Sequence, residues 1–366
     1  MTRAIVVAWA LTISACAAPS AETVLLNGKI FTANPAQPWA TALAIRGERI
    51  VAIGGDAAVE AGAGPSTHRL DLAGRVVVPG LNDAHLALTD ATAASVRLLG
   101  AQALANGVTS IQVFSVSPVA GTVRAFLEAG LPLRVRILRM PQPDATGGNR
   151  DSRPFFPPQP TPRLDVRGMG FALGAEDDER MRQAVGWAYG SEDPLAIASR
   201  DAQATGAYVD ALERHGAADV WKVKRPRLEQ LVAVDPGLLA RLPKLGVVVV
   251  EVPGPGAPLR SVLDAGVPLG LGSGGALRGF DLLRLATAAA LGDERLSMEQ
   301  AVTAYSHGSA IGEFEDQDKG RLAVGALADL AVLSRDPFAA AEEELRTIRA
   351  VLTMIGGRPV YDVPRP

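Results

Sequence analysis

Asp83 and His85 are the first side chains in this sequence whose type and position could do chemistry. They follow three valines, Val76 to Val78, which predict a strand buried on both faces, as in a parallel sheet. Pro79-Gly80 is expected to end that strand. Polar residues after a parallel strand lie where α/β enzymes hold their catalytic groups. We therefore expect Asp83 and His85 at the mouth of a site.

The stretch around these residues resembles the start of the barrel in the amidohydrolase superfamily. There the pattern P-G-[LF]-I-D-x-H-x-H supplies two histidines that bind a catalytic metal. The residues that match it are Pro79, Gly80, Leu81, Asp83 and His85. Residues two apart in an extended chain point the same way, so both imidazoles would face the barrel mouth. The second histidine position is Ala87, which has no donor atom.

The resemblance covers nearly the whole chain and is to the branch that contains N-substituted formamide deformylase. It implies hydrolysis of non-peptide C–N bonds with zinc or another divalent metal. The expected metal ligands are replaced at Ala87, Gly170, Ile197, Gln230 and Gly274. The remaining histidines are not placed to substitute, because His68 is expected in a β-sandwich, His215 near a helix end and His307 inside a long helix. We therefore expect no metal cofactor, with His85 a vestige of the family site.

Other polar side chains are expected at the mouth, and they leave two interpretations open. Asp83 and Glu229 beside His85 are weak candidates for an acid/base pair. The expected pocket residues are Arg200, Asp201, Arg227, Gln230 and Ser273. The simpler interpretation is that these groups orient the barrel's own loops, with Arg200 and Asp201 as a local ion pair at a helix start. Ser273 has no neighbouring histidine to activate it as a nucleophile.

Strand-like and helix-like segments alternate from residue 76 to 315, which predicts a TIM-like (β/α)8 barrel. After the valine run, the expected strands are 108–114, 133–138, 167–173, 194–199, 225–232, 247–252 and 267–274. A long helix is expected over 296–314, with Ser297 and Gln300 as its capping box.

Both ends of the chain predict a small composite β-sandwich, formed by residues 22–75 and 316–366. The first part alternates apolar and polar positions and is broken at Asn27-Gly28 and Arg46-Gly47. The second part resembles the closing strands of the family. We expect a structural role for this domain.

Two segments fall outside this pattern. Residues 1–16 have the shape of a secretory signal peptide, and Ile13 to Cys16 resembles a bacterial lipobox, so Cys16 is the expected lipidation site. We expect a protein anchored by lipid to the outer membrane and facing the periplasm, or periplasmic if Cys16 is not lipidated. The Pro-rich segment 141–163 follows the third barrel strand and is either a lid over the mouth or disordered.

Composition adds few constraints on function. The net charge of −3 over 366 residues offers no basic footprint for nucleic acid. The favoured hypothesis is a non-catalytic amidohydrolase relative that binds a small molecule in a vestigial pocket. The alternative is an active amidohydrolase with an unusual, single-metal site and an amide substrate.

Overall fold

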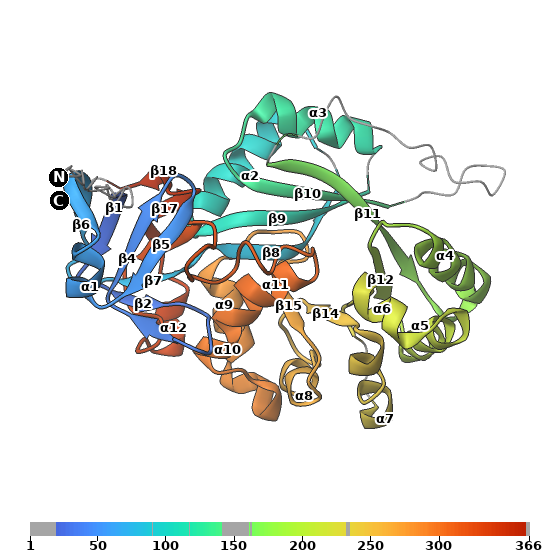
Figure 1. Cartoon of the computed structure of the whole chain (residues 1–366). Helices are drawn as coiled ribbons and strands as arrows, with labels where there is room; N and C mark the ends of the chain where they lie inside the picture. Colours follow the sequence, from blue (N-terminus) through green and yellow to red (C-terminus); the bar gives the residue numbers. More distant parts are fainter. Residues whose placement is uncertain are drawn as a thin grey trace, which may run out of the picture.

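A computed structural model of the chain describes residues 20–89, 91–116, 118–140, 161, 163–231 and 235–363. Its strands form an eight-stranded, a six-stranded and a four-stranded sheet (Figure 1). The expected signal peptide, Cys16 and nearly all of segment 141–163 lie outside the described residues. In the part that is described, no helix is both long and apolar enough to cross a bilayer.

The eight-stranded sheet is a TIM-like barrel, as the strand and helix alternation predicts. Its strands pair in parallel and in chain order from β8 to β15. A parallel bridge between Leu86 and Gly274 joins the two outer edges, so the barrel is nearly closed. The strands are β8 (Leu81–Leu88), β9 (Val108–Ser115), β10 (Arg134–Arg139), β11 (Leu164–Leu173), β12 (Leu195–Ser199), β13 (Arg227–Glu229), β14 (Val248–Glu251) and β15 (Leu269–Leu271).

Helices connect these strands and bury one apolar face against the sheet. In Figure 1, α2 and α3 lie beside β9 and β10, and α4 and α5 lie beside β11 and β12. Helix α5 ends at His215, as predicted. The α-helices are α1 (Asp56–Glu60), α2 (Ala93–Ala105), α3 (Val119–Ala129), α4 (Asp178–Gly190), α5 (Ala202–His215), α6 (Ala218–Lys224), α7 (Pro236–Leu239), α8 (Leu259–Asp264), α9 (Phe280–Thr287), α10 (Met298–Thr303), α11 (Ser309–Ile311) and α12 (Glu342–Leu345).

The valine run is not the first barrel strand, contrary to the sequence-based prediction. β7 (Val76–Pro79) pairs with β16 (Leu330–Leu333) and β2 (Lys29–Phe31) in the six-stranded sheet. The first barrel strand is β8, so Asp83 and His85 lie within a strand and not after one. Gly80 joins the two sheets where a Cβ would lie 2.2 Å from Thr109 Oγ1. An apolar run shows that a strand is buried, but it does not show which sheet buries it.

The two smaller sheets pack face to face around a separate apolar core. That core joins Leu25 and Ile45 of one sheet to Val77, Leu330 and Leu352 of the other. His68 lies on β6, paired with Thr23. The further strands are β1 (Ala21–Leu26), β3 (Trp39–Ala40), β4 (Ala42–Arg46), β5 (Arg49–Gly54), β6 (Ala63–Asp71), β17 (Ala350–Ile355) and β18 (Arg358–Asp362).

The helix predicted over 296–314 is a helical run with a π-helical turn in its middle. α10 and α11 are joined by the π turn Ala304–Gly308. The predicted capping box is confirmed: Ser297 Oγ accepts from the Gln300 N–H at 3.2 Å, and Gln300 Oε1 accepts from the Ser297 N–H at 2.9 Å. The π turn is significant because such turns often re-aim a side chain at a functional site.

Candidate functional site

His85, Glu229 and Arg227 form one hydrogen-bonded chain at the mouth of the barrel. Two strands that are not adjacent in the barrel supply them, with His85 on β8 and the other two on β13. His85 Nδ1 lies 2.8 Å from Glu229 Oε2, and Arg227 Nε donates to Glu229 Oε1 at 2.8 Å. Because a carboxylate oxygen accepts, His85 Nδ1 is the donor in this contact, and Nε2 is the ring nitrogen left on the other side.

Arg227 connects this hydrogen-bonded network to other residues of the barrel interior. Its guanidinium donates to the carbonyl oxygen of Ala84 at 2.8 Å and to the side-chain oxygen of Gln112. The side chains of Arg227 and Glu229 are 1% and 0% exposed. A buried charge pair with a partner at every guanidinium nitrogen is held in one geometry. Removing either member of the pair would leave an uncompensated charge.

Asp83 is also fully committed to hydrogen bonds within the protein. Its Oδ2 accepts from the hydroxyl of Tyr305 at 2.9 Å, and its Oδ1 accepts from the backbone N–H of Ser273 at 3.0 Å and that of His85 at 3.3 Å. Burial raises the pKa of Asp83, although these hydrogen bonds favour its charged form. Tyr305 comes from the π turn, and burial beside Asp83 raises the pKa of its hydroxyl, which keeps it a donor.

The sequence profile of the Amidohydro_3 amidohydrolase family matches residues 86–361. The chain belongs to the amidohydrolase family. Two curated relatives align over short segments: Protein LONG AFTER FAR-RED 3 of Arabidopsis thaliana, 40% identical over 68 residues, and Putative amidohydrolase YtcJ of Bacillus subtilis (strain 168), 36% identical over 69 residues. Each alignment covers 19% of this chain, and they cover 12% and 13% of the respective relatives.

Solved structures share the fold over nearly the whole chain. The zinc complex of atrazine chlorohydrolase TrzN from Arthrobacter aurescens TC1 superposes with a TM-score of 0.71 at 19% identity, covering 93% of this chain and 95% of that one. An adenosine deaminase from Xanthomonas campestris with bound zinc gives 0.70 at 17% identity, covering 94% of each chain. At this identity the likeness establishes the architecture.

The ring of Phe114 lies against Gly170, one of the expected ligand positions. A Cβ on Gly170 would lie 2.7 and 2.8 Å from two carbons of the Phe114 ring, so no side chain fits there unless the ring moves. The same ring stacks on His85 with centroids 4.4 Å apart and planes at 25°. Phe114 is 2% exposed and packs against Leu138 and Ala196. An apolar ring therefore occupies the space between two of the expected ligand positions.

The strand register shows which residues of β12 face the interior. Ala198 pairs with Glu229, and Ile197 pairs with Leu228. Since paired residues share a face and Glu229 points inward, Ala198 faces the interior and Ile197 faces outward. The inward residue that corresponds to the expected ligand is therefore Ala198, one residue after Ile197. Ala198 also has no side-chain donor atom for a metal.

Two further replaced positions, Gln230 and Gly274, both have left-handed backbones. Gln230 has φ of 54°, an uncommon conformation for a residue with a side chain, and its Nε2 lies 3.5 Å from His85 Nε2. Gly274 has φ of 79°, and its N–H donates to the His85 carbonyl at 2.8 Å. Gln230 therefore reaches the free side of the His85 ring, while Gly274 closes the barrel through its backbone.

The groups at this site do not fit the divalent metal that the family implies. The carboxylates of Asp83 and Glu229 already accept hydrogen bonds at both oxygens, and His85 offers only Nε2. Over the described ranges, no cluster of three or more His, Cys, Asp or Glu side chains could hold a metal ion.

Arg200 and Asp201 lie apart from the His85 network. The predicted ion pair between them is not present, because each has other partners. Arg200 is half exposed and pairs with Glu176 at 2.9 Å and with Asp177. Asp201 is the N-cap of α5, where its carboxylate accepts from the N–H groups of Ala204 at 2.7 Å and Ala175 at 3.1 Å. The short polar side chain before a helix was the signal for that capping role.

Sequence reasoning missed several groups that the fold brings to the site, namely Gln112, Phe114, Tyr305 and Glu251. Glu251 is 2% exposed at the end of β14, and its Oε1 accepts from the Leu231 N–H at 2.8 Å. Burial raises its pKa to about 8, and the nearby Glu229 adds to the rise. Its signal was available in the sequence, since Glu251 is the one charged residue in the apolar strand 247–252.

Proposed function

We propose that this protein is a non-catalytic member of the amidohydrolase family whose barrel mouth binds a small, mostly apolar molecule. The observation that carries the proposal is the Phe114 ring, which stacks on His85 and fills the space beside Gly170. A hydrolytic metal centre would need that space for a ligand side chain.

The inward positions around the mouth favour an apolar ligand. Ala87 and Ala198 are half-buried and Ala172 is exposed, so the rim is lined by methyl groups. The polar groups that reach the rim are His85 Nε2 and the exposed amide of Gln230. A few polar groups in an apolar concavity are typical of small-molecule sites, where they set the ligand's orientation.

The proposed setting follows from the N-terminal sequence. Lipid on Cys16 would hold the domain at the outer membrane facing the periplasm, and an unlipidated form would be periplasmic. The likeness to the N-substituted formamide deformylase branch makes a ligand with an amide-like group the natural first choice.

The metal question is tested on the chain lacking residues 1–16, purified without chelator. We expect near-zero zinc, iron and manganese by elemental analysis, and the same melting temperature with and without added zinc. The matched variant His85→Ala should have the same metal content. About one metal per chain that is lost in His85→Ala, with stabilisation by mass action, would overturn the proposal and support the single-metal hydrolase instead.

The proposed binding of a small molecule at the barrel mouth is tested by thermal shift with a panel of neutral alicyclic and aromatic amides. Ala172→Phe narrows the mouth at an exposed position, so it should abolish any ligand-induced shift without changing the melting temperature of the free protein. A shift that survives in Ala172→Phe would place the ligand elsewhere.

A further inference from the structure

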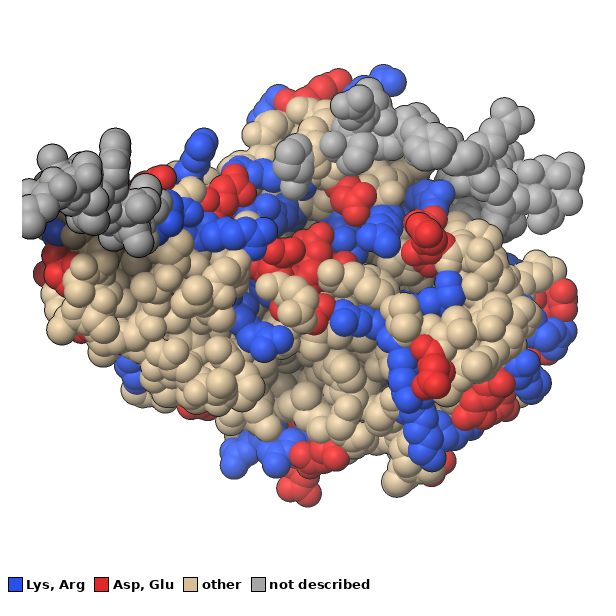
Figure 2. Space-filling view, in the orientation of Figure 1, with Lys and Arg blue, Asp and Glu red and all other residues tan. Residues whose placement is uncertain are grey.

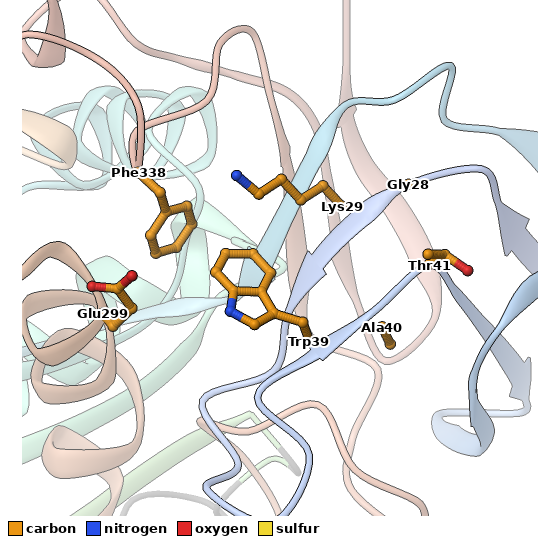
Figure 3. Close-up of a pocket in the computed structure, with 7 residues that line it drawn as sticks. All are labelled: Gly28, Lys29, Trp39, Ala40, Thr41, Glu299 and Phe338. Carbon is orange, nitrogen blue, oxygen red and sulfur yellow. The ribbon is translucent and has the colours of Figure 1, made fainter.

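A surface pocket on the side of the β-sandwich that faces α10 has no part in the barrel site. It has a volume of about 570 Å³ and is lined by Gly28, Lys29, Trp39, Ala40, Thr41, Glu299 and Phe338. Its walls come from β2, β3, the first turn of α10 and the loop after β16 (Figure 3). A concavity of this size suits a small organic molecule.

The wall of the pocket is aromatic. Trp39 is 37% exposed, and its ring centroid lies 4.8 Å from that of Phe338 and 5.1 Å from that of buried Phe31. Phe31 and Phe338 also contact each other at 5.0 Å. Three mutually packed rings form a fixed platform, so a ligand need not order the Trp39 side chain when it binds.

The protein already places one of its own cations on this platform. Lys29 Nζ lies 5.1 Å from the Trp39 centroid and 5.8 Å from that of Phe338. It also pairs with Asp336 at 2.6 Å, which cancels its charge locally. The negative face of an aromatic ring attracts a cation at such distances.

Glu299 leaves the pocket with an uncancelled negative charge. It lies beside the Trp39 indole, on the side away from Ala40 and Thr41 (Figure 3). Its carboxylate is exposed and has no hydrogen bond or ion pair with any residue that the structure describes. With Lys29 and Asp336 balanced, Glu299 and the aromatic wall together favour a ligand of single positive charge.

We propose that this pocket binds an organic ammonium group, with its methyl or methylene groups on Trp39 and Phe338 and its charge beside Glu299. The site is separate from the barrel mouth and does not depend on the function proposed for it. Pairing an aromatic face with one carboxylate selects for charge as well as shape, so a neutral molecule of the same shape should bind poorly.

The test compares choline with 3,3-dimethyl-1-butanol, its neutral carbon isostere, on the purified full-length protein. The readout is the indole N–H signal of Trp39 in NMR spectra of tryptophan-labelled protein, assigned by its loss in Trp39→Phe. We expect choline to shift this signal saturably, and the alcohol to bind about tenfold more weakly. Equal affinity for the two compounds, or no saturable shift with choline, would overturn the proposal.

Two variants identify the groups responsible. Glu299→Gln keeps the shape and removes the charge, so it should weaken choline binding about fivefold or more, whereas Glu192→Gln, an exposed carboxylate after α4, should leave it unchanged. Lys29→Met removes the competing cation and should tighten choline binding. Unchanged binding in Glu299→Gln, or weaker binding in Lys29→Met, would contradict the assignment.

Discussion

At the scale of single residues, Glu229 determines the state of the barrel mouth. One carboxylate joins the imidazole of His85 to the guanidinium of Arg227, so each of the three groups satisfies another. These bonds fix the orientation of the imidazole and leave Nε2 as the ring nitrogen that can face a ligand. The Phe114 ring covers a face of the same imidazole.

Glu229→Gln should be strongly destabilising because it leaves the buried Arg227 without its counter-charge. We expect a loss of about 3–5 kcal/mol in the free energy of unfolding, measured by urea titration. Arg200→Gln removes an exposed guanidinium that pairs with Glu176 and Asp177, and it should cost at most about 1 kcal/mol. If the two variants lost similar amounts, Glu229 would not be a structural anchor of the mouth.

Glu251 should make stability fall as the pH rises. Its folded-state pKa of about 8 lies above the ordinary 4.5, so the folded protein binds this proton more tightly than the unfolded chain does. Between pH 4.5 and about 8, the unfolded chain loses this proton while the folded protein keeps it. The free energy of unfolding therefore falls as the pH rises through this range. Glu251→Gln keeps an acceptor for the Leu231 N–H and removes the titration.

We expect Glu251→Gln to gain about 2–4 kcal/mol in the free energy of unfolding over the wild type near pH 8, and little near pH 4.5. Urea titrations across this range measure the difference, with exposed Glu192→Gln as the control. Parallel pH profiles for Glu251→Gln and the wild type would show that the carboxyl titrates normally.

At the scale of elements, the helical run from α10 to α11 connects the sandwich side of the molecule to the barrel mouth. The Ser297–Gln300 capping box fixes where it begins, and its π turn aims Tyr305 at Asp83. Its first turn also carries Glu299 into the pocket beside Trp39. One helix thus positions a group at each of two separate sites.

Ser297→Ala should destabilise the protein by about 1 kcal/mol, because the N–H of Gln300 loses its side-chain acceptor. The readout is the midpoint of thermal or urea unfolding. Gln203→Ala, on the exposed surface of α5, should change it by less than about 0.5 kcal/mol. A loss no larger than that of the control would mean that water replaces the cap at no cost.

At the scale of the whole molecule, the barrel and sandwich are interleaved along the chain. β7 leads directly into β8 through Gly80, and β16, more than two hundred residues later, returns to pair with β7. The barrel and the sandwich have separate apolar cores, and the continuous segment from β7 through Gly80 to β8 contributes to both. In the space-filling view, charged side chains of both signs are interspersed over the surface, and no large single-sign field appears on that face (Figure 2).

The sequence by itself determined the fold class and the family. The signals were local: the alternating strand and helix patterns, one capping box and the residues from Pro79 to His85. Each is encoded within a short stretch of sequence. The sequence also predicted that the family's metal ligands are replaced, and this stays a prediction. Asp83, His85 and Glu229 were placed together from family spacing, and the structure brings them to one mouth.

Only the tertiary structure decided what fills the place of those ligands. Phe114 is one buried aromatic among many in the sequence, and its stacking on His85 depends on the pairing of β8 with β9. Strand pairing and packing likewise decide three other features: which sheet includes Val76 to Pro79, which face of β12 carries Ala198, and that Tyr305 contacts Asp83. Those contacts join residues far apart in the chain, and no local pattern of residue types encodes them.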